Sequence, residues 1–502
     1  MTRRCILAID QGTTSTKAVL VDGSGMQLAH AACAVGIRFP RPGWVEQDAS
    51  DIWGSVLKAT EQCLEAAGDI EVVGIGICNQ RESALAWDRR TGAAIAPCIT
   101  WQCRRTSEFC EHLARDRESA SWIERTTGLT IDPLFSGSKF RWLLDNLPHG
   151  SARAAAGEIC LGTVDSWLLW NLTNRRVHAT DMSNASRTQL LDIEQGKWSL
   201  RLLDIFGVPS AALPDVRATD APFGEAIHPD WPCRAPILGV AGDSHAAMFA
   251  HAAVAPDVVK ATIGTGSSLM ALTPVAIPSA GTGLSSTVAW NIAQRTTYAM
   301  EGNIASAGAT LDWIGRLFGY VDDPGSAAIQ LATAASDSGG VIIVPAFTGL
   351  GAPHWDDQSR GLICGITRGS GAPQFARAAL ESIAQQVTDV FETMELAVQR
   401  PLVQLHVDGG VTRSDALLQF QADLLGKPVV RDNALDLSAL GIALVAGLGA
   451  QLWTLADLCE LPRAVDRFLP TRTSSDVSGL RDSWRTAIAR TKLRVPAKEQ
   501  RS

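Results

Sequence analysis

A strand–turn–strand pattern with a glycine- and threonine-rich tip occurs twice in this chain and limits the folds open to it. CILAID (5–10) and KAVLVD (17–22) are apolar runs typical of buried strands, and they flank the small polar tip QGTTST. In the second half, VVKATIGTGSSLMALT (258–273) repeats the arrangement of strand, glycine–threonine turn and strand. This repetition predicts a duplicated α/β architecture with a cleft between its two halves.

Strands and helices alternate around these turns, as expected for an α/β protein. Apolar runs at 71–78 and 235–243 predict further buried strands, and a strand, a glycine pair and a helix are expected across 403–426. Segments with helical periodicity lie at 51–67, 104–116 and 138–147.

The length of the chain predicts more than one domain. A chain of 502 residues exceeds what one hydrophobic core usually serves. We place the boundary near 245–255, with one domain at 1–250 and a second at 251–490. The polar residues 491–502 are expected to form a disordered tail.

Composition and charge exclude several classes of protein. A formal net charge of −8 leaves no basic excess to neutralise phosphates, so we expect no nucleic-acid partner. No stretch reaches the ~20 apolar residues of a membrane span, and the apolar run Cys5–Ile9 is too short for a signal peptide. We therefore expect a cytoplasmic protein whose eleven cysteines, none in a C-x-x-C pair, are reduced and mostly buried.

The first turn combines groups that suit phosphate oxygens. A tight turn presents successive backbone N–H groups, and Thr13, Thr14 and Ser15 add hydroxyls. Asp10, at the end of the preceding strand, could hold Mg²⁺ directly or through water, and Lys17 adds positive charge nearby. The alternative is an ordinary hairpin tip in which the aspartate favours the turn.

The second turn, Gly264-Thr265-Gly266-Ser267, admits the same two interpretations. Two such turns on opposite sides of a cleft would grip a triphosphate from both sides. The chain contains no G-x-x-x-x-G-K-[ST] sequence, so a P-loop is excluded, and no G-x-G-x-x-G follows a strand.

Asp243 follows an apolar strand and precedes an expected helix, where α/β sheets deliver ligand-binding groups. A carboxylate at this place could act as a general base toward an attacking hydroxyl. It could instead, or in addition, cap the following helix. His245 lies two residues further on, but no second metal ligand has a suitable spacing, so we assign it to no metal site.

Arg81, Glu82 and Trp101 are ambiguous when taken singly. Arg81 and Glu82 follow a predicted strand and could form a surface ion pair. In a cleft they would offer donors and an acceptor to the hydroxyls of a ligand. Trp101 is either core or an apolar wall against a carbon chain.

Many segments together, in a fixed order, resemble the FGGY carbohydrate kinases, and glycerol kinases most closely among them. The resemblance extends from about residue 5 to about residue 455. The segments that carry it are DQGTT (10–14), PGWVEQD (42–48), NQRE (79–82), TWQCRRT (100–106), GTVDSWLLW (162–170), NASRT (184–188), AGDSHAA (241–247), PAFTGLGAPHWD (345–356), RGLICGITRG (360–369) and DGG (408–410).

The resemblance implies two ribonuclease-H-like, actin-like domains closing on a cleft, with polyol bound mostly by the first and ATP mostly by the second. Thr13, Thr14 and Ser15 would contact phosphate, Asp10 and Asp243 would hold Mg²⁺, and Asp243 would be the general base. Arg81, Glu82 and Trp101 would line the polyol site. The nucleotide would lie against Thr265, Gly308, Gly409 and Gly410. Lys17 stands where these kinases usually have arginine, and Asp312 stands where they usually have glutamine.

Three departures from the glycerol kinase pattern fall in the implied substrate pocket. Leu134 replaces a tyrosine, Ser244 a glutamine and Ser268 a phenylalanine. All three changes reduce side-chain size, and two remove hydrogen-bonding reach, on which discrimination between hydroxylated substrates depends. The hypothesis is a polyol of four or five carbons as substrate; the alternative is that neighbouring groups or water fill the space and glycerol stays preferred.

Two other functions remain open from the sequence. An actin-like or chaperone ATPase has the same nucleotide cleft, although it needs no Arg–Glu–Trp polyol site. A polyol-binding sensor without phosphotransfer is the second alternative, against which intact Asp10 and Asp243 argue. Assembly into a homo-oligomer is typical of the family. The segment 226–236 lacks the glycine-rich loop that binds a sugar bisphosphate in some bacterial glycerol kinases, so we expect no such inhibition.

Overall fold

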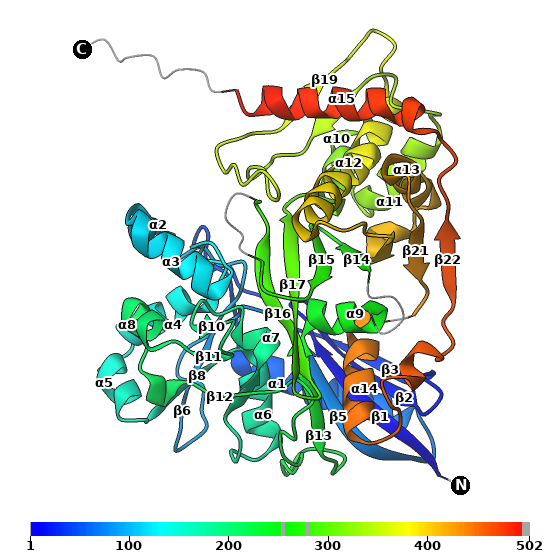
Figure 1. The fold of residues 1–502 in the computed structure, drawn as a ribbon. Helices are drawn as coiled ribbons and strands as arrows, with labels where there is room; N and C mark the ends of the chain where they lie inside the picture. Colours follow the sequence, from blue (N-terminus) through cyan, green and yellow to red (C-terminus); the bar gives the residue numbers. More distant parts are fainter. Residues whose placement is uncertain (1, 253–256, 278–281, 435, 494–502) are drawn as a thin grey trace, which may run out of the picture.

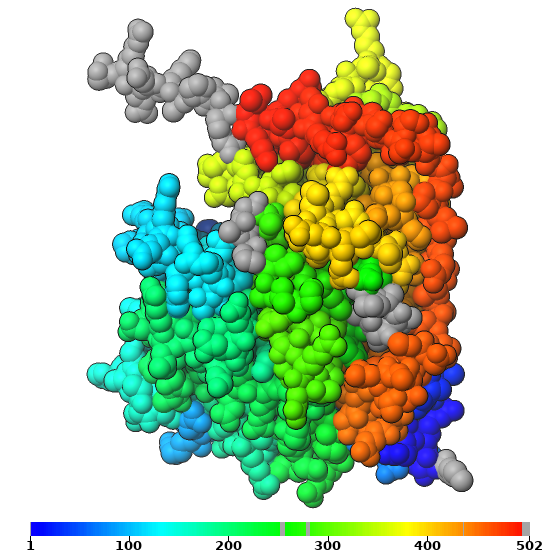
Figure 2. Space-filling view, viewed as in Figure 1, coloured from blue at the N-terminus to red at the C-terminus, as the bar shows by residue number. Residues whose placement is uncertain are grey.

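The computed structural model describes residues 2–252, 257–277, 282–434 and 436–493. Each half of the chain builds one large mixed sheet. In Figure 1 the first sheet lies at the lower right, and the second lies above it, with its hairpin at 285–304 reaching down beside the first half. The space-filling view of this face is notched at its left side, between the cyan segment that holds α2 and α3 and the yellow-green segment near residue 350 (Figure 2).

The first sheet has five strands in the order β13-β5-β1-β2-β3. β1 pairs in parallel with β5 and antiparallel with β2, and β5 pairs in parallel with β13. The strands are β1 (Arg3–Gln11), β2 (Ser15–Asp22), β3 (Gln27–Ala34), β5 (Ile70–Asn79) and β13 (Ile237–Gly242).

The second sheet has seven strands in the order β16-β17-β15-β14-β20-β21-β22. Its inner five strands, β17-β15-β14-β20-β21, repeat the antiparallel and parallel pairings of the first sheet. The predicted duplication is therefore confirmed as a repeated topology. The strands are β14 (Val258–Ile263), β15 (Ser267–Thr273), β16 (Ser285–Ile292), β17 (Arg295–Ile304), β20 (Gln404–Asp408), β21 (Val429–Asp432) and β22 (Val465–Phe468).

The central strands are apolar on both faces because helices or other strands cover both sides. Residues Cys5–Ile9 of β1 are fully buried, as expected for the middle of a sheet covered on both faces. α1 (Ala49–Glu65) packs on β2 and β3, and its first turn is capped by Asp48, which accepts a hydrogen bond from the Ser50 N–H. α14 (Leu437–Gly449) covers β1, β5 and β13, although it comes from the second half of the chain.

The second sheet is covered mainly by α12 (Ala372–Val398), with α10 (Gly308–Leu317), α11 (Pro324–Thr333) and α13 (Asp415–Leu425) beside it. α15 (Ser474–Thr491) crosses the top of this lobe (Figure 1). Two short strands, β18 (Ile342–Val344) and β19 (Leu362–Cys364), pair with each other and contact α15.

A long insertion between β5 and β13 forms the outer part of the first lobe and carries several predicted site residues. Its helices are α2 (Ser107–Arg115), α3 (Arg117–Thr127), α4 (Ser136–Asp145), α5 (Gly150–Ala155), α6 (Val164–Leu172), α7 (Met182–Ala185) and α8 (Leu200–Phe206). Its short strands are β6 (Leu85–Asp88), β7 (Cys98–Ile99), β8 (Ile159–Gly162), β9 (Ala179–Asp181), β10 (Leu191–Asp192), β11 (Lys197–Trp198) and β12 (Asp215–Arg217), and β4 (Glu46–Gln47), which precedes α1, pairs with β7.

The expected local elements at 51–67, 104–116 and 138–147 correspond to α1, α2 and α4. The division at 1–250 and 251–490 stays a prediction, and of the tail at 491–502 the residues beyond 493 lie outside the described part of the chain. Within the described ranges, no helix is long and apolar enough to cross a bilayer.

Candidate active site

The carboxyl ends of three parallel strands bring the predicted catalytic residues to one edge of the first sheet. Asp10 lies near the end of β1, and Asp243 follows β13 directly. Between them β5 ends at Asn79, and the N–H of Gln80 donates to the Gln11 carbonyl at 2.7 Å. This edge is where open α/β sheets place ligands.

Asp10 is buried and lies beside one half-exposed cation and a second buried carboxylate. Lys17, its register partner on β2, lies 3.5 Å from Asp10 Oδ2 and 2.6 Å from Asp436 Oδ2. Burial and the charge of Asp436 raise the pKa of Asp10 well above its ordinary value, while Lys17 opposes the shift. Asp436 also caps α14, so the second half of the chain supplies part of this cluster.

Asp243 is the first residue of α9 (Asp243–Ala252), and both roles considered for it, general base and helix cap, stay predictions. Its Oδ1 accepts a hydrogen bond from the adjacent Ser244 N–H at 2.6 Å, whereas an N-cap side chain bonds to an N–H two or three residues further on. The same oxygen lies 3.3 Å from Arg81 Nε. Burial raises the pKa of Asp243, and Arg81 opposes that shift.

Arg81 and Glu82 are not paired with each other, which corrects the surface ion pair considered from the sequence. Arg81 donates to both oxygens of Glu301, from Nη2 at 2.7 Å and from Nη1 at 3.1 Å. Glu82 accepts from Arg187 Nε at 2.6 Å, and Arg187 Nη1 lies 2.8 Å from Glu301. An alternating chain of charges, Asp243–Arg81–Glu301–Arg187–Glu82, therefore runs through the buried wall of the site.

Glu82 is held by its backbone as well as by its side chain. Its φ of 61° lies in the left-handed region, which is unusual for a residue other than glycine. Its carbonyl accepts from Ser136 Oγ at 3.1 Å and from Lys139 Nζ at 3.0 Å, and Lys139 also donates to the Leu134 carbonyl. Burial lowers the pKa of Lys139 to about 8, opposed by the charge of Glu82. One buried amine therefore ties together two turns of the predicted polyol pocket.

Trp101 lies on the surface of the site, so the interpretation as core is wrong. Its side chain is 38% exposed, and its Nε1 donates to Thr13 Oγ1 at 2.9 Å. This hydrogen bond links the predicted polyol wall to the first glycine–threonine turn. Leu134, Ser244 and Ser268 are all partly exposed, and Ser268 Oγ donates to Glu301 Oε1 at 2.8 Å.

His245 is buried under the same wall and contacts Thr287 Oγ1 at 3.3 Å. Burial, and the positive charge of Arg81, hold the pKa of His245 well below its ordinary value. A neutral imidazole under the charged wall avoids adding a third cation beside Arg81 and Arg187.

The second glycine–threonine turn lies against the start of α10. Gly308 N–H donates to the Gly264 carbonyl and Ala307 N–H to the Thr265 carbonyl, each at 2.9 Å. A side chain at Gly308 would place a Cβ 2.6 Å from the Gly264 oxygen, so the close approach requires glycine. The structure therefore brings the predicted residues Thr265 and Gly308 together.

Gly409 and Gly410 follow β20, the neighbour of β14 in the second sheet. Gly409 has a φ of 99°, and a Cβ there would lie 2.5 Å from the Ile263 carbonyl, so this turn also packs beside the end of β14. Asp312 lies further along α10, where its Oδ1 faces Gly325 of α11. It is partly buried and does not belong to the exposed turn formed by Thr265, Gly409 and Gly410.

The donor set fits Mg²⁺ at the edge where Asp10 and Asp243 converge. The charge of Asp243 is close enough to Asp10 to raise the pKa of Asp10 further. Mg²⁺ commonly binds through one or two carboxylates together with water and substrate phosphates. Two neighbouring carboxylates beside the turn that holds Thr13, Thr14 and Ser15 match that preference. In the described ranges, no group of three or more His, Cys, Asp or Glu side chains forms a metal site of the all-protein kind.

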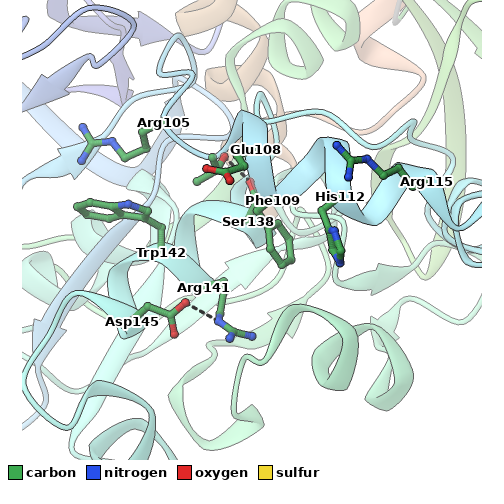
Figure 3. A pocket seen from close by; sticks show the side chains of 10 residues that line it. Arg105, Glu108, Phe109, His112, Arg115, Ser138, Arg141, Trp142 and Asp145 are labelled. Carbon is green, nitrogen blue, oxygen red and sulfur yellow. Dashed lines mark hydrogen bonds and ion pairs between the residues drawn. The ribbon is translucent and has the colours of Figure 1, made fainter.

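A separate hollow lies on the other side of α4 and contains none of the predicted site residues (Figure 3). Its volume is about 490 Å³, and Arg141 and Asp145 form an ion pair within its lining. Ser138 of α4 lines this hollow, whereas Ser136 and Lys139 of the same helix contact the Glu82 carbonyl. The hollow and the predicted polyol site therefore lie on different sides of α4.

Residues 5–250 match the N-terminal domain, and residues 259–450 the C-terminal domain, of the FGGY family of carbohydrate kinases. The chain belongs to this family. It is therefore an ATP-dependent carbohydrate kinase with the two-domain, actin-like fold of that family, as the sequence predicted.

Similar proteins include both sugar and glycerol kinases. The chain is 45% identical to an apulose kinase of Pectobacterium atrosepticum over 498 residues, covering 98% of this chain and 99% of that protein. It is 44% identical to a glycerol kinase of Trichlorobacter lovleyi, covering 97% of this chain and 98% of that protein. The structure of Plasmodium falciparum glycerol kinase with ADP superposes with a TM-score of 0.92 at 29% identity, covering 98% of this kinase and 99% of that chain.

Four residues of the site escaped the sequence reasoning: Glu301, Arg187, Lys139 and Asp436. Arg187 belongs to the segment NASRT, which carried the resemblance but received no role. Glu301 is a single charged residue in the mostly apolar strand end YAMEGNI, and such an isolated carboxylate could have drawn attention to it. Lys139 and Asp436 lie in ordinary helical contexts, in which no local signal distinguishes them from surface residues.

Proposed function

We propose that this kinase transfers the γ-phosphate of ATP to a terminal hydroxyl of glycerol or of a slightly larger polyol or sugar. The observation that carries the proposal is the buried chain of charges that ends at Asp243 and Glu82 beside the first glycine–threonine turn. A pure ATPase needs no such wall, so the actin-like alternative is less well supported.

Asp243 acts as the general base in this proposal. The hydroxyl of the substrate is held by Arg81 and Glu82 and lies against the exposed face of Trp101. Asp243 takes its proton as the oxygen attacks the γ-phosphorus. The guanidinium of Arg81, 3.3 Å from Asp243, orients that carboxylate.

The phosphates lie between the two glycine–threonine turns. The hydroxyls and N–H groups of Thr13, Thr14 and Ser15 face them from one side, and those at Thr265 and Gly308 face them from the other. Lys17 supplies positive charge. Asp10 and Asp243 hold Mg²⁺, which when bound neutralises charge on the transferring phosphoryl group.

The identity of the acceptor depends on Leu134, Ser244 and Ser268, which are smaller than the residues of the glycerol kinase pattern. Each is partly exposed in the site. The space that they leave favours a four- or five-carbon acceptor over glycerol. Apulose, the five-carbon sugar for which one relative is named, belongs to the same size class.

The test is ADP release by the purified protein with MgATP across glycerol, erythritol, threitol, xylitol, ribitol and apulose, with a control that has no acceptor. A longer acceptor with the highest kcat/KM supports the larger-substrate proposal. A glycerol kcat/KM well above all others overturns it and leaves a glycerol kinase with an unusual pocket. Acceptors that bind without stimulating ADP release would instead support a sensor.

The cytoplasmic location and assembly into a homo-oligomer remain predictions of the same proposal. Sedimentation of the purified protein measures the oligomeric state directly.

A further inference from the structure

Glu301 lies at the centre of the charged wall but comes from the opposite lobe. It is carried by β17 of the second sheet, in register with Met270 of β15 and Ser285 of β16. The two arginines that it contacts, Arg81 and Arg187, belong to the first lobe, and the sequence separation between Glu301 and Arg81 is 220 residues. The substrate wall of the first lobe is therefore completed by a side chain of the second.

The carboxylate of Glu301 is fully buried, and each of its oxygens has two partners. Oε1 accepts from Arg81 Nη2 at 2.7 Å and from Ser268 Oγ at 2.8 Å. Oε2 accepts from Arg81 Nη1 at 3.1 Å and lies 2.8 Å from Arg187 Nη1. A bidentate contact fixes the plane of a guanidinium as well as its position.

Each arginine also contacts, through its Nε, a carboxylate that is predicted to act on the substrate. With its terminal nitrogens bound to Glu301, Arg81 directs Nε at Asp243, 3.3 Å away. Arg187 directs Nε at Glu82 Oε1, 2.6 Å away. Arg187 is itself fully buried, and neither Nη1 nor Nη2 has a hydrogen-bond partner among the residues that the structure describes, so the ion pair of Nη1 with Glu301 compensates its charge. Removal of the Glu301 charge would therefore leave both cations poorly compensated.

Stability alone does not explain this arrangement. Buried ion pairs contribute little stability relative to well-packed apolar residues of the same volume, because desolvation offsets the attraction. The arrangement does have a geometrical consequence, since Glu301 sets the orientation of the residues at both ends of the chain, Asp243 and Glu82.

We propose that Glu301 is a positioning residue that fixes Arg81 and Arg187 for acceptor binding, and that Ser268 acts through it by completing its hydrogen bonds. The proposal rests on the proposed phosphotransfer function. It gives Ser268 a second role besides leaving space in the pocket, because its hydroxyl supplies the third hydrogen bond to the carboxylate, after the two from Arg81. A phenylalanine, as in the glycerol kinase pattern, could not supply that donor.

The test is a double-mutant cycle of Glu301→Gln and Ser268→Ala, measured on the best acceptor of the panel. Glu301→Gln keeps the shape but removes the charge, and we expect kcat/KM for the acceptor to fall by about 10²-fold while KM for ATP is unchanged. Ser268→Ala keeps the space but removes the donor, with an expected loss of about tenfold. In the Glu301→Gln background the effect of Ser268→Ala should disappear, because the two residues act through one contact.

Ser285→Ala is the matched control. Ser285 is a buried serine directly across the ladder from Glu301, and in the described part of the chain no hydrogen bond joins its hydroxyl to that carboxylate. Its replacement should leave kcat/KM unchanged. Glu301→Asp retains the charge and should recover part of the activity lost in Glu301→Gln. A merely structural role would instead lower the melting temperature and affect the kinetic constants for the acceptor and for ATP alike.

Equilibrium binding of acceptors by calorimetry separates failure of this inference from failure of the proposed function. If the wild type turns over an acceptor but Glu301→Gln matches the wild type in kcat/KM, the positioning role is refuted and the phosphotransfer proposal stands. Additive losses in the cycle refute the coupling of Ser268 to Glu301. If the wild type neither binds nor phosphorylates any acceptor, the proposed function fails and the inference fails with it.

Discussion

The two proposed binding surfaces, one for the acceptor and one for the nucleotide, are built on different physical principles. The proposed acceptor wall, formed by Asp243, Arg81, Glu301, Arg187 and Glu82, is made of charged side chains that neutralise one another. Its inner members, Arg187 and Glu301, have no exposed surface. The proposed nucleotide wall is made of two turns, in which Thr265, Gly409 and Gly410 are exposed. Prearranged side chains discriminate among hydroxyl patterns, whereas backbone N–H groups bind any phosphate in the right place. Selectivity should therefore reside in one wall and general phosphate binding in the other.

The largest effect is expected from Asp243→Asn, which tests the acceptor wall at its catalytic end. Asparagine keeps the shape of the side chain and one acceptor oxygen, so the contact to the Ser244 N–H can persist. The amide cannot accept the substrate proton, and we expect kcat to fall by at least ~10²-fold. Binding of an ATP analogue and the melting temperature should match the wild type. A kcat near the wild-type value would remove Asp243 from the role of base.

A dependence on pH follows from the same residue. Burial raises the pKa of Asp243, and a general base works only when ionised. The activity is thus complete above the raised pKa and is lost as the pH falls through it. We expect kcat/KM for the acceptor to fall about tenfold per pH unit on an acid limb that lies above the usual carboxylate range. Return of an acid-treated sample to neutral pH should restore full activity, which excludes denaturation as the cause. A profile that stays flat down to about pH 5 would contradict the shift.

The contrast between the walls also explains what could be predicted from the sequence. Each turn of the proposed nucleotide wall is local, because GTGS and DGG are each a single short run of consecutive residues. Glycine is needed in this region because neighbouring carbonyls approach closely, as at Gly308. Asp10 and Asp243 were predictable because each ends an apolar strand, and parallel strands end at one edge of a sheet.

The acceptor wall could be predicted only in part, because its contacts join distant segments. Arg81 and Glu82 are adjacent, and their adjacency suggested a pair. In the structure Arg81 instead contacts Glu301, and the left-handed backbone of Glu82 directs its carboxylate to Arg187. No periodicity or spacing in the sequence encodes a contact of this kind, since it depends on how the two lobes are placed.

Gly308→Ala tests the nucleotide wall separately. The new Cβ would lie 2.6 Å from the Gly264 carbonyl, so the turn or the start of α10 must shift. We expect KM for ATP to rise about tenfold, because displaced groups no longer fit the phosphates. Binding of the acceptor, measured by calorimetry without nucleotide, should be unchanged. Gly479→Ala is a suitable control, since a Cβ there meets nothing within 4 Å. Equal losses for both substrates would show that the walls are not independent.

The smallest effect is expected from Leu134→Tyr, which sharpens the assignment of selectivity to the acceptor wall. Leu134 is partly exposed, and its carbonyl is held by Lys139, so its backbone should tolerate a larger side chain. The tyrosine restores the glycerol kinase pattern, and we expect the ratio of kcat/KM for glycerol to that for the best longer acceptor to rise about fivefold.

Leu134→Phe is the matched control, since it fills nearly the same volume without a hydroxyl. If phenylalanine reproduces the shift, space alone sets the preference; if only tyrosine does, the hydroxyl contributes a contact. No change with either variant would move selectivity away from this position, toward Ser244 and Ser268.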